Sequence, residues 1–219
     1  MRPARLHARP SSAAPASQGE LRLHVLRVGT YPAYLVDPGA PGPVPLIISL
    51  HGAGGHAQQG LERLAREARD ARVALLAPES TGGTWDAIHG RFGVDVAAID
   101  EALRQAFALV AVDPARICLA GFSDGASYAL GLGLANGDLF THIAAFSPGF
   151  VPGADAVGEP RVFMAHGTAD PILPIDRTSR VIVPVLRGRG LAVDYREFDG
   201  GHLVPEAERK AAMDWLLST

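Results

Sequence analysis

Two kinds of apolar pattern alternate along the chain. Compact apolar runs rich in Val, Ile and Leu predict strands, at residues 22–28, 33–37, 46–50, 73–77, 116–120, 143–146, 162–165 and 193–198. Longer segments in which apolar residues recur every three or four positions predict helices, at residues 58–70, 94–110, 124–135, 178–186 and 206–217. This alternation is typical of an α/β fold, in which a mostly parallel central sheet carries helices on both faces.

The spacing of these elements predicts a single domain over residues 21–219. No large cap domain is expected, because no stretch between consecutive elements is long enough to form one. Residues 1–20 are rich in Arg, Ala and Ser and contain no acid before Glu20. That composition slightly resembles a transit peptide, but the apolar core of a secretion signal is missing. We interpret residues 4–8 as a short edge strand and residues 10–20 as a flexible loop.

Composition narrows the class of protein further. The 219 residues suit one domain with one core. The 20 basic and 23 acidic residues give a net charge of −3, so we expect neither nucleic acid nor an anionic membrane as a partner. No apolar run reaches the roughly 18 residues that span a bilayer. Cys118 is the one cysteine, which excludes an internal disulfide and favours a cytoplasmic location, whereas the oligomeric state stays open.

The segment Gly121-Phe122-Ser123-Asp124-Gly125 matches the pattern G-x-S-x-G, directly between a predicted strand and a predicted helix. A serine on so sharp a turn is held in a strained backbone conformation, and the flanking glycines avoid collisions with neighbouring side chains. The turn also places the hydroxyl at a helix N-terminus, where N–H groups favour negative charge. We predict Ser123 as a nucleophile; the alternative is a glycine-rich turn whose serine only caps the helix.

A second glycine-rich loop, His51-Gly52-Ala53-Gly54-Gly55, follows the predicted strand at 46–50. Acyl transfer requires two N–H donors aimed at the oxyanion of the tetrahedral intermediate. One is expected from Asp124, the residue after the nucleophile, and the other from this loop, with Ala53 as first choice and Gly54 as second. A phosphate-binding loop is the competing interpretation, but the Lys and the spacing of that motif are missing. We interpret His51 as structural.

Chain order narrows the search for a general base. In the fold that carries G-x-S-x-G, the partners follow in the order Ser, then Asp or Glu, then His. Three histidines follow Ser123, namely His142, His166 and His202. Only His202 lies in a loop between the last predicted strand and the last predicted helix, so it is the predicted base. His142 opens a strand and His166 ends one, and both are interpreted as framework histidines.

The acid is chosen among four aspartates in the same way. Asp170 lies just past the predicted strand at 162–165, and it is 47 residues after Ser123 and 32 before the predicted base. Asp155 lies in a loose Gly/Ala loop, Asp176 is placed to cap a helix, and Asp199 is too close in sequence to the base. We therefore predict Asp170 as the acid that orients the histidine.

Taken together, these motifs resemble a known family. HGAGG, TWD, GFSDGASYAL, AFSPGF, HGTAD with LPID, and YREFDGGH look like the small carboxylesterases of the α/β-hydrolase superfamily, near its phospholipase/carboxylesterase and polyhydroxybutyrate-depolymerase-like branches. The resemblance spans residues 45–217. It implies Ser123, Asp170 and His202 as a catalytic triad, and the backbone of Ala53 and Asp124 as the oxyanion hole.

Two related groups fit less well. Acyl-protein thioesterases carry Gln-Gly after the serine, where this chain has Asp124-Gly125. Dienelactone hydrolases use a cysteine at the turn, whereas Cys118 lies five residues too early and is expected in the core.

The substrate side is less constrained by the sequence. The segment 149–160 is rich in Gly, Pro and Ala and is expected either to rim an acyl pocket or to form a mobile loop. The candidates for substrate binding are Gly54, Trp85, Phe92, Phe122 and Phe150. For the aromatic side chains, ordinary core packing is the alternative. Asp86 and Asp95 are candidates for bonding the active-site loops.

The predicted function is hydrolysis of small or medium acyl esters through an acyl-enzyme, with a small-molecule ester as the partner. A catalytically silent binding domain of the same fold, and a serine peptidase or thioesterase with the same triad, remain as alternatives. We expect no cofactor and no metal, because the histidines have no tight ligand spacing.

Overall fold

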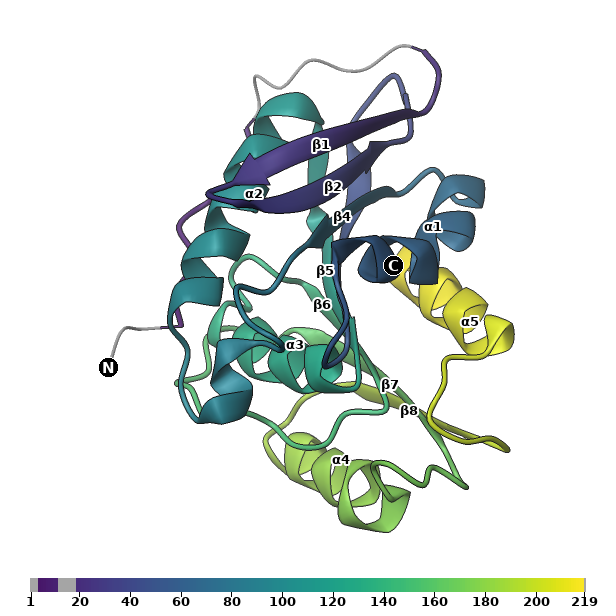
Figure 1. The fold of residues 1–219 in the computed structure, drawn as a ribbon. Coiled ribbons are helices and arrows are strands. Elements are labelled where there is room, and N and C mark those ends of the chain that lie inside the picture. Colours follow the sequence, from purple (N-terminus) through teal and green to yellow (C-terminus); the bar gives the residue numbers. More distant parts are fainter. Residues whose placement is uncertain (1–3, 12–18, 219) are drawn as a thin grey trace.

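A computed structural model describes residues 4–11 and 19–218. Its centre is an eight-stranded sheet in the order β1-β2-β4-β3-β5-β6-β7-β8 (Figure 1). The strands are β1 (Arg22–Val28), β2 (Tyr31–Asp37), β3 (Val44–Leu50), β4 (Ala74–Pro78), β5 (Val112–Phe122), β6 (His142–Phe146), β7 (Arg161–Gly167) and β8 (Val193–Phe198). β1 pairs antiparallel with β2, and β2 with β4, whereas all the other pairs are parallel.

Within the described residues, five α-helices cover the two faces of the sheet. They are α1 (Ala57–Asp70), α2 (Val94–Leu109), α3 (Asp124–Ala135), α4 (Ser179–Gly188) and α5 (Glu206–Leu217). One core cluster contains residues of α2, α3 and α4, and the other contains residues of α1 and α5. Figure 1 shows the two groups on opposite sides of the sheet. The α/β fold class predicted from the alternation of patterns is therefore confirmed.

The buried strands explain why periodicity located them so well. In β3 all seven residues are buried. Leu46 and Ile48 enter one core cluster while Ile47 enters the other, because successive side chains of a strand point to opposite faces. A strand covered on both faces reads as a continuous apolar run rather than an alternating one. None of the helices in the described part of the chain is long and apolar enough to cross a membrane.

Most of the predicted boundaries are close to the observed ones. Strands β1 and β8 and helices α3 and α5 have the predicted bounds, and β2 and β3 each begin two residues earlier than predicted. Periodicity missed two short 3₁₀ helices, η1 (Asp86–His89) and η2 (Ile175–Arg177), because a single turn shows no repeat. Cys118 lies fully buried in β5 as expected, and burial raises the pKa of its thiol.

The edge strand predicted for residues 4–8 is wrong. Ala4, Leu6 and Ala8 are buried, as in a strand with one buried face, but the segment pairs with no strand. Its backbone is held by side chains instead: the N–H of Leu6 donates to Asn136 Oδ1 (2.8 Å), and that of Ala8 to Asp100 Oδ1 (2.8 Å). Most of the loop predicted for 10–20 lies outside the described residues.

Replacing Asn136 tests how much this segment contributes to stability. The buried Asn136 amide accepts from the N–H of Leu6 and donates to the carbonyls of Ala4 and Leu132. Asn136→Ala leaves these groups without partners, so we expect a loss of about 2 kcal/mol in the free energy of unfolding, measured by urea denaturation. Gln105→Ala removes an exposed amide and serves as the control, with an expected loss below about 0.5 kcal/mol. Equal losses in both variants would contradict this account.

Candidate active site

The turn between β5 and α3 holds Ser123 in a strained conformation. Its φ of 57° and ψ of −121° lie where a residue with a side chain is disfavoured. The flanking glycines are required by close approach of the backbone. A Cβ at Gly121 would collide with the carbonyl of Gly125, and a Cβ at Gly125 would collide with the carbonyls of Leu50 and His51. The turn is therefore packed directly against the end of β3 and the loop that follows it.

The three residues predicted as a triad lie in hydrogen-bonding contact. Nε2 of His202 is 2.9 Å from Oγ of Ser123, and its Nδ1 is 2.7 Å from Oδ2 of Asp170. They come from the ends of β5, β7 and β8, which are parallel strands whose carboxyl ends meet at one edge of the sheet. The structure thus brings together residues 79 and 32 positions apart in the sequence.

The environment of Asp170 favours its charged form. Its Oδ1 accepts hydrogen bonds from the N–H groups of Ile172 and Leu173, each at 2.9 Å, and its side chain is fully buried. Burial opposes the charge, but the hydrogen bonds from Leu173, His202 and Ile172 outweigh it and hold the pKa of Asp170 below its ordinary value. A carboxylate at Oδ2 requires a proton on Nδ1 of His202, which leaves Nε2 free to accept from the Ser123 hydroxyl.

The two rejected histidines have different surroundings. His166 is fully buried, with Nδ1 at 2.6 Å from Oγ of Ser179 and Nε2 at 2.8 Å from the carbonyl oxygen of Leu173. It therefore supports the loop that carries Asp170, as a framework histidine would. His142 bonds only through Nδ1, to Oγ1 of Thr141 (2.7 Å), and its buried Nε2 has no partner among the described residues. The prediction of a framework histidine bonded to its surroundings is therefore correct for Nδ1 of His142 but not for its Nε2.

The glycine-rich loop after β3 lies against the nucleophile. A Cβ at Gly52 would be 3.4 Å from the Cβ of Ser123. The N–H of Gly54 donates to the carbonyl of Gly83 at 2.7 Å, so this donor is already committed, and Ala53 remains as the loop donor. The N–H of Asp124 is at the first position of α3, where helical geometry provides no internal acceptor. Both first-choice oxyanion donors are therefore available, although their role stays a prediction.

His51 acts as a structural link, in agreement with its interpretation. Its Nδ1 lies 2.8 Å from the carbonyl oxygen of Gly52, and its Nε2 accepts from the N–H of Ser80 at 3.1 Å. The carbonyl of His51 accepts from Nε1 of Trp85 at 2.9 Å. Burial lowers the pKa of His51, which keeps the ring neutral and its nitrogens matched to these partners.

A network of side chains joins the loop after β4 to the rest of the site. Asp95 is fully buried, and its carboxylate accepts hydrogen bonds from the N–H of Thr81 and the N–H of Asp86, both at 2.7 Å. The prediction that these carboxylates bond loops at the site is confirmed for Asp95, whereas the carboxylate of Asp86 accepts from the N–H of Asp95 in α2 (2.9 Å). Thr84 Oγ1 donates to Oδ2 of Asp124 (2.8 Å), a contact that no sequence pattern indicated.

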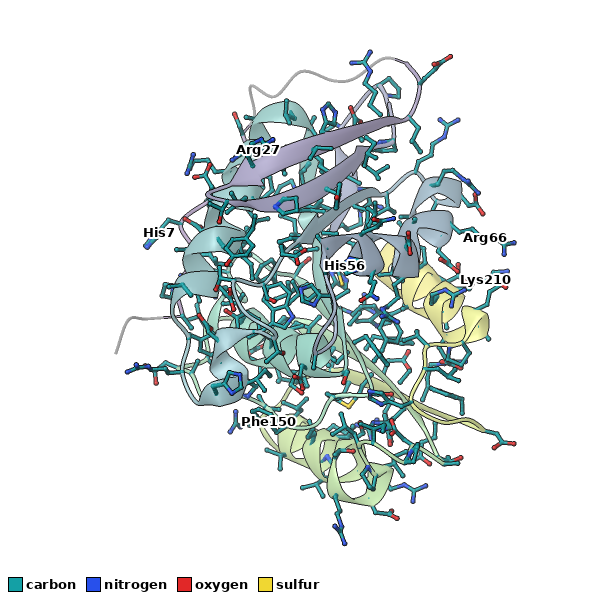
Figure 2. All side chains as sticks on the ribbon, viewed as in Figure 1. His7, Arg27, His56, Arg66, Phe150 and Lys210 are labelled. Carbon is teal, nitrogen blue, oxygen red and sulfur yellow. The ribbon has the colours of Figure 1, made fainter. Side chains whose placement is uncertain are left out.

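The residues predicted to bind substrate do not form one pocket wall. Trp85 is fully buried and packs against the rings of His51 and Tyr128, so the alternative of ordinary core packing holds for this residue. The ring of Phe122 lies 4.7 Å from that of His202, and Phe150 is 42% exposed (Figure 2). Gly54 is exposed.

A cavity of about 1170 Å³ lies elsewhere, between η1, the end of α3 and the segment 153–157. Phe92 lines it, as do Asp86 and Arg91. Its lining includes neither a triad residue nor an oxyanion donor among the described residues. The middle of the segment 149–160, at residues 153–155 and 157, therefore lines this separate cavity. In the described part of the chain no group of three His, Cys, Asp or Glu side chains could hold a metal ion.

Comparisons with known proteins find sequence relatives that match part of the chain. No family model matches the chain. A probable feruloyl esterase C of Aspergillus oryzae is 29% identical over 143 residues, which cover 60% of this chain and 50% of that protein; a second, of Aspergillus flavus, is 28% identical over the same length. The chain thus spans about half the length of the curated relatives that it matches.

Solved structures match the chain over most of its length. Esterase PE8 aligns with a TM-score of 0.69 at 23% identity, covering 91% of this chain and 99% of that one. A carboxylesterase of Bacillus cereus gives 0.66 at 22% identity, over 86% and 94% of the two chains. S-formylglutathione hydrolase of Staphylococcus aureus gives 0.73 at 14% identity, over 94% and 100%. These neighbours are esterases and hydrolases, and the likeness establishes the fold.

The pH dependence of stability tests the environment of His142. Burial, reinforced by the positive charge of Arg161, lowers the pKa of His142 to about 4. Between pH 6.5 and pH 4 the unfolded chain therefore binds a proton at this site that the folded chain does not. The free energy of unfolding should fall as the pH is lowered through this window, by up to about 1.4 kcal/mol per pH unit.

We expect His142→Phe, which keeps a ring against Trp215, to show a shallower fall than the unchanged protein in urea denaturation at pH 7, 6 and 5. Parallel curves for the two proteins would show that His142 is not responsible.

Proposed function

We propose that this chain, which has the α/β-hydrolase fold, is a serine esterase that hydrolyses small or medium acyl esters through an acyl-enzyme. The observation that carries the proposal is the chain of hydrogen bonds from Asp170 through His202 to Ser123. A nucleophile, a base and a group that orients the base are the arrangement that activates a serine hydroxyl. The esterase names of its relatives and structural neighbours support the choice of an ester.

In the first half of the reaction, Oγ of Ser123 attacks the ester carbonyl carbon while Nε2 of His202 accepts the hydroxyl proton. Charge then develops on the former carbonyl oxygen, where the N–H groups of Ala53 and Asp124 act as donors. The bond to the leaving alcohol breaks as the imidazolium of His202 returns its proton to the alcohol oxygen. Asp170 stabilises that imidazolium and holds the ring in the required tautomer.

Water completes the cycle. His202 removes a proton from a water molecule, which attacks the acyl carbon, and Ser123 leaves as the free hydroxyl when His202 protonates it. The strained backbone at Ser123 favours this role, because it fixes the hydroxyl at the N-terminus of α3, next to the N–H of Asp124. Within the described residues no segment between core elements is long enough for a cap domain, which favours an accessible site for small esters.

Covalent labelling tests the nucleophile. We expect a fluorophosphonate probe to label the protein and Ser123→Ala to abolish labelling and hydrolysis of p-nitrophenyl acetate and butyrate. Ser147→Ala is a matched control, because Ser147 also has a positive φ at a strand end but no hydrogen-bond partner for its Oγ in the described structure. It should be labelled as the unchanged protein is. Absence of labelling, or labelling that survives Ser123→Ala, would favour a silent binding domain.

The substrates tested beside the two p-nitrophenyl esters should include a thioester and an aminoacyl amide of the same acyl group. Faster turnover of either than of the matched ester would replace the esterase proposal with a thioesterase or peptidase on the same triad.

Replacing Asp170 tests whether this carboxylate orients His202. Asp170→Asn keeps the size of the side chain but can donate to Nδ1 of His202 and favour the wrong tautomer. We expect kcat to fall by about 10³–10⁴-fold, with little change in KM. Asp176→Asn is the control, since Asp176 was a rival for the same role and its side chain is 76% exposed beside Arg180. A loss in Asp176→Asn as large as in Asp170→Asn would refute the assignment.

A further inference from the structure

Arg63 of α1 lies close to the proposed catalytic histidine. Its guanidinium carbon is 4.3 Å from the centre of the Phe122 ring, and that ring is centred 4.7 Å from the ring of His202. The guanidinium and the imidazole are therefore no farther apart than the sum of these two short distances. Phe122 directly precedes Ser123, so one aromatic ring contacts both the cation of α1 and the proposed base, although α1 contributes no residue to the triad.

The charge of Arg63 has no counterion in the described structure. No carboxylate pairs with its guanidinium, and no hydrogen bond forms from it; its Nε is buried and without a partner. Glu67, one helical turn further along α1, is already bonded to Nε of Arg209 at 2.9 Å. Burial and the nearby charge of Arg209 both lower the pKa of Arg63. The positive charge is thus partly desolvated and repelled, and only the Phe122 ring offsets it.

Neighbouring arginines on the same helix each pair with a carboxylate. Arg66 is 65% exposed and pairs with Glu206 at 3.2 Å, and Arg69 pairs with Asp70 at 3.2 Å. Figure 2 shows Arg66 projecting outward from α1. A cation–π contact contributes only about 0.5–1 kcal/mol at exposed sites, and the buried Nε of the half-buried Arg63 still has no hydrogen-bond partner among the described residues. The contrast indicates that a ligand supplies the missing anion.

We propose that Arg63 binds an anionic group on the leaving-group side of the substrate, so that the enzyme prefers esters whose alcohol carries a carboxylate. The inference rests on the proposed esterase function. His202 returns its proton to the leaving alcohol, so the alcohol oxygen lies near Nε2 of this residue. The proposal places a carboxylate about one benzene ring from that oxygen against the guanidinium, which the two short contacts of the Phe122 ring keep near His202. Arginine holds carboxylates with two parallel N–H donors, which suits it to this role.

A matched pair of esters tests the proposal. In 4-acetoxybenzoate and methyl 4-acetoxybenzoate the acetyl group is the same, and only the first carries a negative charge on the leaving phenol. We expect kcat/KM, corrected for the hydroxide-catalysed rate of each ester, to favour the carboxylate in the unchanged protein. In Arg63→Gln the ratio of the two values should fall by about tenfold or more, mainly through KM for the charged ester.

Arg66→Gln is the control, since it removes the same charge three residues away on the exposed side of α1. Its ratio should stay within about twofold of that of the unchanged protein, because a charge so exposed is screened by salt. Arg63→Lys should recover part of the preference, since it restores the charge without the paired donors.

An unchanged ratio in Arg63→Gln, or an equal fall in Arg66→Gln, would overturn the proposal. A parallel loss for both esters would also overturn it, because Arg63 would then only hold Phe122 against His202. Hydrolysis of neither ester by the unchanged protein would contradict the esterase function itself, which separates the two failures.

Product inhibition gives a second measurement that needs no variant, should Arg63→Gln fail to fold. 4-Hydroxybenzoate should inhibit the unchanged protein at least about tenfold more strongly than methyl 4-hydroxybenzoate. Equal inhibition by the two phenols would overturn the proposal as well.

Discussion

The close approach of three backbone segments around Ser123 is the constraint on which the rest of the site depends. The turn after β5 folds so tightly that Gly121 meets the backbone at Gly125, and Gly125 in turn meets the end of β3. No side chain larger than hydrogen fits at either glycine. Within this contact Ser123 has a positive φ, and the glycine-rich loop after β3 lies against it. The position of the nucleophile and that of the N–H donors are therefore set by the same packing.

Two kinds of support then complete the site. The parallel strands β5, β7 and β8 end at one edge, so loops that follow them can place the serine, acid and base within hydrogen-bonding distance. Buried polar groups beneath the loops fix the orientation of their backbone. Asp95 receives N–H groups of the loop after β4, and His51 bridges that loop to the one after β3. Polar groups so buried and so fully bonded hold the site rigid.

Charge is distributed unevenly around this rigid centre. The carboxylate of Asp170 is satisfied by two backbone N–H groups and by His202, so its charge is used within the protein. The guanidinium of Arg63, which lies over the Phe122 ring, has no such partner in the described residues. A site with a compensated anion and an uncompensated cation is suited to a substrate that brings its own negative charge. This asymmetry links the packing of α1 to the proposed preference among esters.

The sequence by itself determined the fold class, most element boundaries and the three candidate triad residues. These features are local, or they follow from chain order: buried strands are apolar runs, the serine turn is five consecutive residues, and the acid and base follow known strands. Only the tertiary structure decided that residues 4–8 bond to side chains of α2 and the end of α3, that Trp85 is buried, and that Arg63 lies over Phe122. Such contacts join side chains distant in sequence, and their packing leaves no period in the chain.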